Sequence, residues 1–492
     1  MFNLNFTSKL TSTLIPDAAT PTTANNFSIL QRMVKDAHFS YVKCETFPNP
    51  KLISVSENCL KEILGCNERT IENIKADSKT KEEFVKYFTG EIPLYEKQNP
   101  WALAYAGHQF GSYAGQLGDG RAISLAQFYD PNGKIQELQL KGAGLTPYSR
   151  FADGYAVLRS SIREYLCSEA MYHLNIPTSR ALCLIGTDKI VYRETPETGA
   201  VVCRVAPSWI RFGSFELPFY RKEVKLLKIL ADYTIENFFS KLANHEKKYE
   251  PDYICNHSDE AGVYSFENQP NAAYFNMAKF ATALVPLVLE EEGNDKQKTG
   301  NVLTEILQSF VNEMKEKHLL EMHKKLGFST KTEESMELVK LLLVALPPAK
   351  VDYTIFFREL SEFKTKCNTD EELVLPPTIF IEKAKESNVG SSKDNLKLLK
   401  DWFKSYNNYL IKENMNDEAR HLRMKSVNPK YILRNNLVQD CITLAEKGNY
   451  SLLEKYFKVL QKPFDEGTAE DYQLFGGLVP NEKRRIRCSC SS

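Results

Sequence analysis

Five glycines crowd into fourteen residues just ahead of a strand-like run. The stretch 104–125, AYAGHQFGSYAGQLGDGRAISL, contains Gly107, Gly111, Gly115, Gly118 and Gly120. Because glycine loses more backbone entropy on folding than any other residue, such a cluster indicates that another group must come close to the backbone. A phosphate is one candidate for that group. A set of tight turns is the alternative interpretation of the same pattern.

The residues that follow the glycines predict a β-hairpin. RAISLAQF alternates with period two, DPNG at Asp130–Gly133 is a strong turn signal, and IQELQL continues the alternation. The second strand of this hairpin delivers Lys141 at its end. Further along, ALCLIG and DKIVYRE predict another strand pair.

A helix is predicted between these two strand regions. Leu158, Ile162, Leu166 and Ala170 recur every four residues, and the pattern stops before Pro177. Glu164 lies in this helix, 23 residues after Lys141. A strand lysine paired with a helix glutamate under a glycine-rich cover is the arrangement that protein kinases use to hold ATP phosphates.

Two arginines and the glycine turns strengthen the nucleotide interpretation. Arg204 and Arg211 flank RVAPSWIR, and guanidinium groups suit phosphate oxygens. Gly118 and Gly120 stand beside Arg121, where backbone N–H groups are expected to meet phosphate. Each feature alone is weak, and their joint order favours a nucleotide site.

Composition excludes some classes of function. The 492 residues include 63 basic and 63 acidic side chains, so no bulk charge indicates a nucleic-acid partner. The longest apolar runs, Phe280–Leu289 and Leu338–Leu346, are shorter than the roughly 18 residues that span a bilayer. We therefore expect that the protein has neither a nucleic acid nor a membrane as a partner. We also expect it to be a monomer.

The pattern of apolar and polar residues changes near Glu216 and divides the chain into two parts. Mixed α/β patterns precede it and long amphipathic helices follow it. We expect a leader or disordered N-terminus at 1–27, an N-terminal lobe with the glycine-rich loop at 28–215, a helical C-terminal lobe at 216–485 and a flexible tail at 486–492. The predicted fold class is thus α/β (α+β), with two lobes.

The N-terminus and the cysteines give information about the cellular compartment of the protein. The first residues are rich in Ser, Thr and Asn and hold no acidic residue before Asp17, which partly fits a mitochondrial leader; a cytoplasmic protein is the alternative. Eleven scattered cysteines predict buried thiols in a reducing compartment, apart from Cys488 and Cys490 in the polar tail. His318 and His323 are five residues apart and are expected to be solvated rather than ligands.

Long motifs identify a family resemblance. YAGHQFGSYAGQLGDGRAI, ELQLKGAGLTPYSRFADG, AVLRSSIREYLCSEAM, CRVAPSWIRFGSFE, ICNHSD and NPKYILRN resemble the selenoprotein O family, from about Phe27 to Ser492. The resemblance implies a protein kinase-like fold and transfer of AMP from ATP to Ser, Thr or Tyr hydroxyls of proteins, with Mg²⁺ or Mn²⁺. Carried over by position, the nucleotide contacts are Gly118, Gly120, Arg121, Lys141, Asp153, Gly154, Arg204 and Arg211, with Glu164 as the partner of the lysine.

The family's catalytic segment is missing from the sequence. The resemblance implies an Asp-Asn pair and a later Asp-Tyr-Gly-Pro-Phe-Gly motif, which supply the base and the metal ligands, between Arg211 and Cys255. The chain instead passes from HEKKYE directly to PDYICNHSD. Asp394-Asn395 is the only Asp-Asn pair outside this stretch and indicates a helix N-terminus. We therefore expect an inactive or severely impaired transferase, through exon loss or a faulty gene model rather than true degeneration.

Two alternatives accompany the transferase interpretation. One is a nucleotide-binding scaffold without transfer activity, and the other is a thiol-redox protein. The resemblance places a family redox residue at Cys490, third from the end. A disulfide between Cys490 and Cys255 is one expectation, and an ordinary buried thiol at Cys255 is the other.

Overall fold

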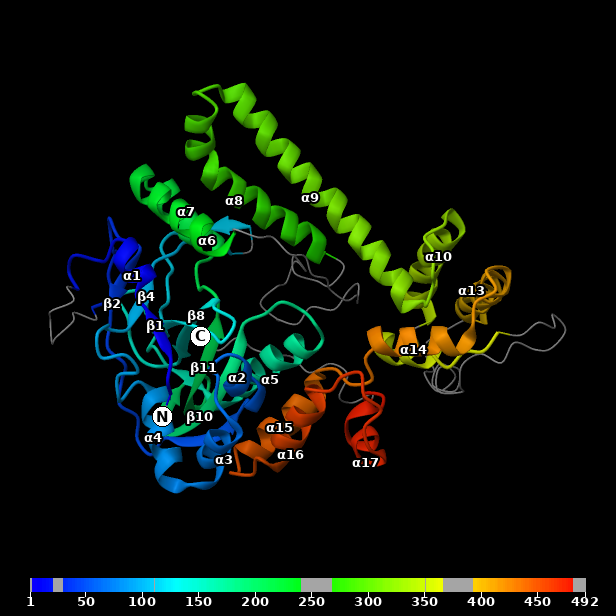
Figure 1. The fold of residues 1–492 in the computed structure, drawn as a ribbon, viewed down its shortest axis with the longest axis horizontal. Helices are drawn as coiled ribbons and strands as arrows, with labels where there is room; N and C mark the ends of the chain where they lie inside the picture. Colours follow the sequence, from blue (N-terminus) through cyan, green and yellow to red (C-terminus); the bar gives the residue numbers. More distant parts are fainter. Residues whose placement is uncertain are drawn as a thin grey trace.

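The computed structural model describes residues 2–20, 30–109, 111–239, 268–349, 351–365 and 393–480 (Figure 1). A sheet-based body holds the N-terminal half of the chain, and helices extend from it. The mixture of helices with an antiparallel sheet confirms the predicted two-lobed α/β, kinase-like class.

One nine-stranded sheet organises the body within the described residues. Its main path runs β2-β4-β7-β8-β11-β10-β3, while β1 pairs with β7 and β9 pairs with β11. All of these pairings are antiparallel. The strands of this sheet are β1 (Asn5–Thr7), β2 (Phe39–Tyr41), β3 (Lys51–Val55), β4 (Trp101–Leu103), β7 (Ala122–Tyr129), β8 (Ile135–Lys141), β9 (Ala156–Val157), β10 (Arg180–Tyr192) and β11 (Pro196–Ala206). A separate short pair joins β5 (His108–Gln109) to β6 (Ser112–Tyr113).

Helices cover the sheet and build the rest of the chain. Those in the first half are α1 (Lys9–Thr13), α2 (Glu57–Glu62), α3 (Glu68–Ala76), α4 (Ser78–Thr89), α5 (Leu158–His173), α6 (Phe212–Tyr220) and α7 (Val224–Phe238). Those in the second half are α8 (Gln269–Glu291), α9 (Lys296–Lys325), α10 (Glu333–Ala349), α11 (Tyr353–Leu360), α13 (Lys393–Lys412), α14 (Asp417–Val427), α15 (Asn435–Ala445), α16 (Ser451–Leu460) and α17 (Ala469–Asp471).

The predicted β7–β8 hairpin is confirmed. Ala122 pairs with Lys141 at one end and Tyr129 with Ile135 at the other. The turn forms because Asp130 Oδ1 accepts hydrogen bonds from the amides of Asn132 and Lys134, both at 2.9 Å. A side-chain acceptor of this kind stabilises the turn that DPNG predicts.

The second predicted strand pair is wrong, because both segments belong to one strand. ALCLIG and the first five residues of DKIVYRE lie in β10, which pairs with β11 on both sides of an irregularity. The register shifts between Gly186 and Ile190, so a bulge interrupts the ladder there. A bulge inserts extra residues without reversing the chain, which is why GTDK resembles a turn in the sequence.

Residues expected to form a leader or a disordered N-terminus are part of the fold. Within 2–20, β1 pairs with β7, and Leu10 and Leu14 are buried in the core against α7. Asp17 forms an ion pair with Arg32. The disordered alternative is wrong for these residues, because their few apolar side chains are spaced to enter the core, while the leader stays an expectation.

The helices of the second half pack in more than one place. One core unites the end of α9 with α10, α11, α13 and α14. The later helices α15 and α16 return to the body, where Phe457 stacks on Tyr165 of α5 at 4.8 Å between ring centroids. The expected boundary at 215/216 falls inside α6, whose residues on both sides are buried.

Two helix predictions stand and one detail changes. The long amphipathic patterns form α9 and α13 as expected, and Asp394 lies in the first turn of α13. Pro347 and Pro348, of a residue type that usually breaks a helix, lie in the last turn of α10. Near a C-terminus their missing N–H groups and ring clashes affect only the final turn.

One helix in the described part of the chain has the length and hydropathy of a membrane span. This is α8, with a mean hydropathy of 1.4 over 18 residues. The sequence run Phe280–Leu289 is shorter because a lysine at 279 interrupts the apolar residues. Length and composition alone are weak grounds for a membrane.

Candidate nucleotide site

The predicted lysine–glutamate pair forms between a strand end and a helix. Lys141 is the last residue of β8, and Glu164 faces it from the second turn of α5. Lys141 Nζ donates to Glu164 Oε2. Leu158, Ile162 and Leu166 anchor the same helix in a core cluster that it shares with β10, β11, α15 and α16.

Arg204 shares the same glutamate. It lies on β11 opposite Gln139 of β8, and its Nη1 donates to Glu164 Oε1 at 3.0 Å. Its Nη2 donates to Gln139 Oε1, and its guanidinium lies 4.3 Å from the ring centroid of Trp209. The adjacent strand register therefore joins Arg204 to Lys141 through one carboxylate.

Arg211 joins this group through residues that the sequence analysis missed. Its Nη2 lies 3.2 Å from Asp119 Oδ1, and its guanidinium stacks 4.5 Å from the ring of Tyr105. Gln139 Nε2 donates to Asp119 Oδ2 at 3.2 Å. We call the resulting chain of side chains the polar network; its members are Lys141, Glu164, Arg204, Gln139, Asp119 and Arg211.

The polar network carries surplus positive charge. The cations of the polar network are Lys141, Arg204 and Arg211, and the nearby charge of Arg121 also helps lower the pKa of Lys141. Asp119 and Glu164 are the carboxylates that oppose them. Burial raises the pKa of nearby Glu137 to about 8. Three cations against two carboxylates leave the network with one positive charge in excess, which favours an anion.

The pKa values of the central pair reflect this imbalance. Burial lowers the pKa of Lys141, and the neighbouring Arg204 charge adds to the effect against the opposing pull of Glu164. For Glu164, burial raises the pKa, but the charges of Arg204 and Lys141 outweigh it and hold the pKa below the usual range. Glu164 therefore stays ionised, and Lys141 gains from any further negative charge placed beside it.

Gly118 and Gly120 approach the chain itself. A Cβ on Gly118, where φ is +106°, would lie 2.5 Å from Tyr148 Cγ, and a Cβ on Gly120 would lie 2.8 Å from the carbonyl oxygen of Tyr148. The amide of Gly120 already donates to the carbonyl of Gly118 at 2.9 Å. The tight-turn interpretation thus explains these glycines locally, and a phosphate would reach the Gly120 amide only as a second acceptor.

Asp153 and Gly154 lie beside the turn that follows Lys141. The amide of Gly144 donates to the carbonyl of Gly154 at 3.2 Å, so the two glycines cross at close range. Arg193 donates two hydrogen bonds to Asp153: Nη1 to Oδ2 at 2.7 Å and Nη2 to Oδ1 at 3.1 Å. Burial raises the pKa of Asp153, but its bonds to Arg193 outweigh that effect and lower the pKa overall. Arg193 is a further residue that the sequence did not single out.

Replacing Gly154 with alanine is expected to destabilise the protein more than the same change at Gly448. Both have similar left-handed φ values, +79° and +76°. A Cβ at Gly154 would lie 2.3 Å from the carbonyl carbon of Gly144, whereas no atom lies within 4 Å at Gly448. We expect about 1 kcal/mol at Gly448 from backbone strain and about 1–3 kcal/mol more at Gly154 from overpacking. Chemical unfolding of both variants measures this, and equal losses would contradict the tight crossing.

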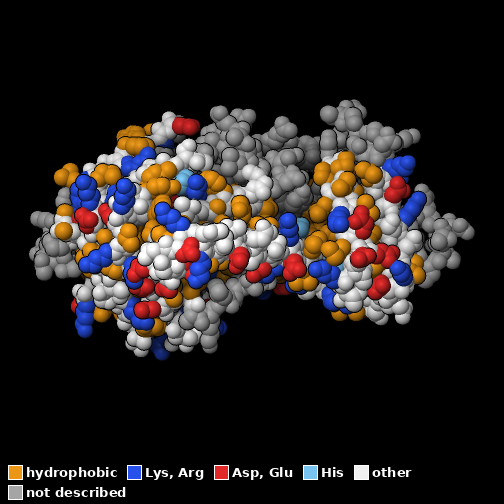
Figure 2. Space-filling model, turned by 90° about the horizontal axis from the view of Figure 1, so that it is seen from above, with side chains coloured by type: hydrophobic (Ala, Val, Ile, Leu, Met, Phe, Trp, Pro, Cys, Tyr) orange, Lys and Arg blue, Asp and Glu red, His pale blue; other side chains and the backbone are white. Residues whose placement is uncertain are grey.

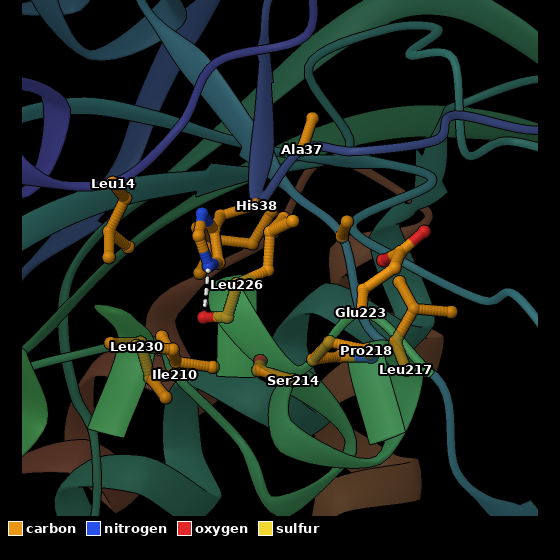
Figure 3. A pocket seen from close by; sticks show the side chains of 12 residues that line it. Leu14, Ala37, His38, Ile210, Ser214, Leu217, Pro218, Glu223, Leu226 and Leu230 are labelled. Carbon is orange, nitrogen blue, oxygen red and sulfur yellow. Dashed lines mark hydrogen bonds between the residues drawn. The ribbon is translucent and has the colours of Figure 1, made fainter. Parts of the chain in front are cut away.

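A small cavity elsewhere is not the nucleotide site. It lies between the N-terminal segment and helices α6 and α7, lined mostly by apolar side chains such as Leu14 and Leu230 (Figure 3). It has room for no more than a water molecule. His38 crosses it: its Nδ1 accepts from the amide of Ile15 at 2.9 Å, and its Nε2 donates to the carbonyl of Leu226 at 3.0 Å.

The His38 bridge predicts a loss of stability at acidic pH. Burial lowers the pKa of His38 below its ordinary 6.5, and the neutral ring is the form whose Nδ1 accepts from the amide of Ile15. The unfolded chain thus binds the proton more readily, so this stability is complete above about pH 6.5 and is lost as the pH falls toward the folded pKa. Denaturant unfolding should show a shallower decline between pH 7 and 5 for His38→Gln. Identical slopes would contradict the assignment.

Other predicted site features have different outcomes. Cys255, Cys488 and Cys490 lie outside the described residues, so the Cys255–Cys490 disulfide stays a prediction. Five of the cysteines in the described ranges are buried thiols, as expected. His323 is not solvated, because it is buried and lies 3.2 Å from Ser335 Oγ. No cluster of three His, Cys, Asp or Glu side chains able to hold a metal ion occurs among the residues that the structure describes.

Comparison with known proteins gives the family. The family model described as "Protein adenylyltransferase SelO" matches residues 22–250 and 246–461. The chain is 38% identical to the protein nucleotidyltransferase YdiU of Flavobacterium johnsoniae over 556 aligned positions, covering 100% of each chain. It is 35% identical to the YdiU proteins of Cupriavidus metallidurans, covering 92% of this chain and 89% of that one, and of Herminiimonas arsenicoxydans, covering 95% and 97%. The chain therefore belongs to the SelO family of protein adenylyltransferases.

Proposed function

We propose that this chain binds ATP at the polar network, with Lys141 and the arginines on the phosphates. The observation that carries the proposal is that Lys141 and Arg204 both form ion pairs with Glu164. This shared carboxylate holds both cations at one strand edge. The surplus positive charge supports a polyphosphate as the ligand. Gly118, Gly120, Arg121, Asp153, Gly154 and Arg211 complete the proposed nucleotide surroundings.

The metal that the family implies does not fit the described carboxylates. Mg²⁺ takes oxygen ligands, and carboxylates are its usual protein donors. Each carboxylate near the polar network is already held by a cation: Glu164 by Lys141 and Arg204, Asp119 by Arg211, and Asp153 by Arg193. Binding of ATP is therefore assigned here to the side-chain cations alone.

The transfer of AMP to protein hydroxyls is proposed to be absent from this chain as written. The family match breaks into two segments that meet at residues 246–250, where the sequence lacks the expected Asp-Asn and Asp-Tyr-Gly motifs. The alignment with the Flavobacterium relative has 556 positions against 492 residues here, so 64 positions fall opposite gaps in this chain. A nucleotide-binding scaffold without transfer activity is the function that this supports.

Isothermal titration calorimetry with ATP tests the proposal. We expect saturable binding with Mg²⁺ and also with EDTA, because side-chain cations supply the charge. AMP should bind more weakly than ATP, since it offers fewer phosphate oxygens. The absence of saturable heat for ATP at millimolar concentration would overturn the assignment.

A further inference from the structure

A short buried loop lies directly against the glycines of the proposed nucleotide site. We call residues 118–121 the glycine turn and residues 146–149 the support loop; all four residues of the support loop are buried. A Cβ on Gly118 would lie 2.5 Å from Tyr148 Cγ, and a Cβ on Gly120 would lie 2.8 Å from the Tyr148 carbonyl oxygen. Because the glycine turn carries no side chain at either point, the support loop lies close enough to reach its carbonyls.

Two buried hydroxyls of the support loop bind these carbonyls. Thr146 Oγ1 donates to the carbonyl of Asp119 at 2.7 Å, and Ser149 Oγ donates to the carbonyl of Gly120. Thr146 is 0% exposed and Ser149 is 3% exposed, so water does not compete for either bond. Two consecutive carbonyls of the glycine turn are thus fixed by side chains from a different part of the chain.

The two hydroxyls are themselves held in one orientation. The amide of Thr146 donates to Ser149 Oγ at 2.8 Å, and the amide of Tyr148 donates to Thr146 Oγ1 at 3.1 Å. Since each hydroxyl oxygen accepts a backbone N–H, its own proton is directed at the glycine turn. Tyr148 is anchored as well, because its hydroxyl lies 2.9 Å from Ser40 Oγ, which donates to Asp17 Oδ2 at 2.9 Å.

The direction of a carbonyl fixes the direction of the amide that follows it. In a planar trans peptide, the C=O of one residue and the N–H of the next point to opposite sides of the chain. Ser149 binds the Gly120 carbonyl on the side of the support loop, so the N–H of Arg121 points away from that loop. Arg121 directly precedes Ala122, which pairs with Lys141 at the end of β8. The positive end of this peptide therefore lies near the strand end that carries Lys141.

Broad surface charge does not account for selection of a polyphosphate. The chain has 63 basic and 63 acidic side chains, and on the face shown in Figure 2 the two kinds are interspersed. Attraction of an anion from a distance needs charge of one sign gathered in one place. Affinity for phosphate then depends on how well the few groups around Lys141 are positioned before ATP arrives.

We propose that Thr146 and Ser149 are positioning residues for ATP, whose hydroxyls hold the glycine turn in the conformation that binds it. Asp119 then keeps its ion pair with Arg211, and the last peptide of the turn keeps its N–H on the phosphate side. Without the hydroxyls, the freedom of the two glycines lets the turn change conformation, and ATP must order it at a cost in affinity. The inference rests on the proposed ATP site and adds the residues that pre-organise it.

Removing one hydroxyl while keeping the shape of its side chain tests this role. Thr146→Val keeps the volume but has no proton for the Asp119 carbonyl, whereas Thr146→Ser keeps the hydroxyl. Calorimetry should show ATP binding weakened on the order of tenfold by Thr146→Val and largely restored by Thr146→Ser. Hydrogen exchange at residues 118–121 should be faster in Thr146→Val alone. Equal ATP affinity of folded Thr146→Val and the unaltered chain would overturn the inference.

A similar pair of hydroxyls elsewhere separates positioning from general stability. At the start of α10, the amide of Thr332 donates to Ser335 Oγ at 2.9 Å, and Ser335 is 0% exposed. Ser149→Ala should weaken ATP binding in the same way as Thr146→Val, and it replaces that variant if Thr146→Val does not fold. Ser335→Ala should lower the midpoint of denaturant unfolding but leave ATP affinity unchanged. Equal weakening of ATP binding by Ser149→Ala and Ser335→Ala would contradict a positioning role.

The outcomes distinguish this inference from the proposed ATP site. If the unaltered chain shows no saturable ATP binding, the ATP site is wrong and the inference is overturned with it. If Lys141→Ala weakens ATP binding but neither Thr146→Val nor Ser149→Ala does, the ATP site stands and the positioning role is wrong. Weakening of ATP binding by all three variants supports both.

Discussion

Arg204→Ala is expected to weaken ATP binding by on the order of tenfold or more. Arg204 supplies one of the three cations of the polar network and shares the Glu164 carboxylate with Lys141. Without it, Glu164 is opposed by Lys141 alone, so the network loses its surplus positive charge. A charge-assisted hydrogen bond contributes about 1.5–3 kcal/mol, and about 1.4 kcal/mol corresponds to a tenfold change in affinity. Lys141→Ala and Arg211→Ala should act in the same direction, as calorimetry can measure.

Arg159→Ala provides a matched control for this loss of charge. Arg159 also lies on α5 and also forms an ion pair, with Nε 2.6 Å from Glu197 Oε2. That pair belongs to the β11 end remote from Arg204, so its removal should leave ATP affinity unchanged. Equal weakening by Arg159→Ala would indicate a general electrostatic effect. Unchanged affinity in all three network variants would remove the nucleotide assignment.

Local sequence patterns predicted the elements that present the central pair. Period-two alternation and a DPNG turn set the β7–β8 hairpin, and a four-residue repeat set α5. Lys141 and Glu164 meet because one ends a strand and the other faces that strand from the next helix. Both placements depend on short-range patterns, which is why the pair could be predicted from the residues alone.

Residues joined only through space could not be predicted. Asp119 and Gln139 connect Arg204 to Arg211 because β8 lies between β7 and β11, and strand order is not visible in any local pattern. Arg193 reaches Asp153 across forty residues for the same reason. The bulge in β10 was also missed, since extra residues in a strand and a reversing turn share the same polar composition.

The composition of the N-terminal residues did not predict that some of them belong to the core. Ser, Thr and Asn dominate the stretch that includes β1 and α1, and this resembles a leader. What composition does not show is that Leu10 and Leu14 are spaced four apart, so one face of a short helix enters the core beside α7. Two apolar side chains at the right spacing outweigh a polar average.

The chain is expected to transfer no AMP to protein. Phosphoryl-type transfer needs a positioned base and neutralisation of the charge that develops on the phosphate oxygens. The cations of the polar network bind the nucleotide, but each nearby carboxylate is already engaged by one of them or by Arg193. Neither a free base nor a metal ligand set is therefore present among the described residues around the polar network.

Incubation with α-labelled ATP, Mg²⁺ or Mn²⁺ and a model protein acceptor measures the transfer. Lys141→Ala is the informative control, because any label that the chain incorporates should be lost in this variant if the nucleotide binds where we propose. Label incorporation by the unaltered chain would mean that a carboxylate other than Glu164, Asp119 and Asp153 serves as base. Saturable ATP binding without label incorporation is the expected outcome, because the side-chain cations bind phosphate but no free carboxylate beside them can take the proton of an acceptor hydroxyl.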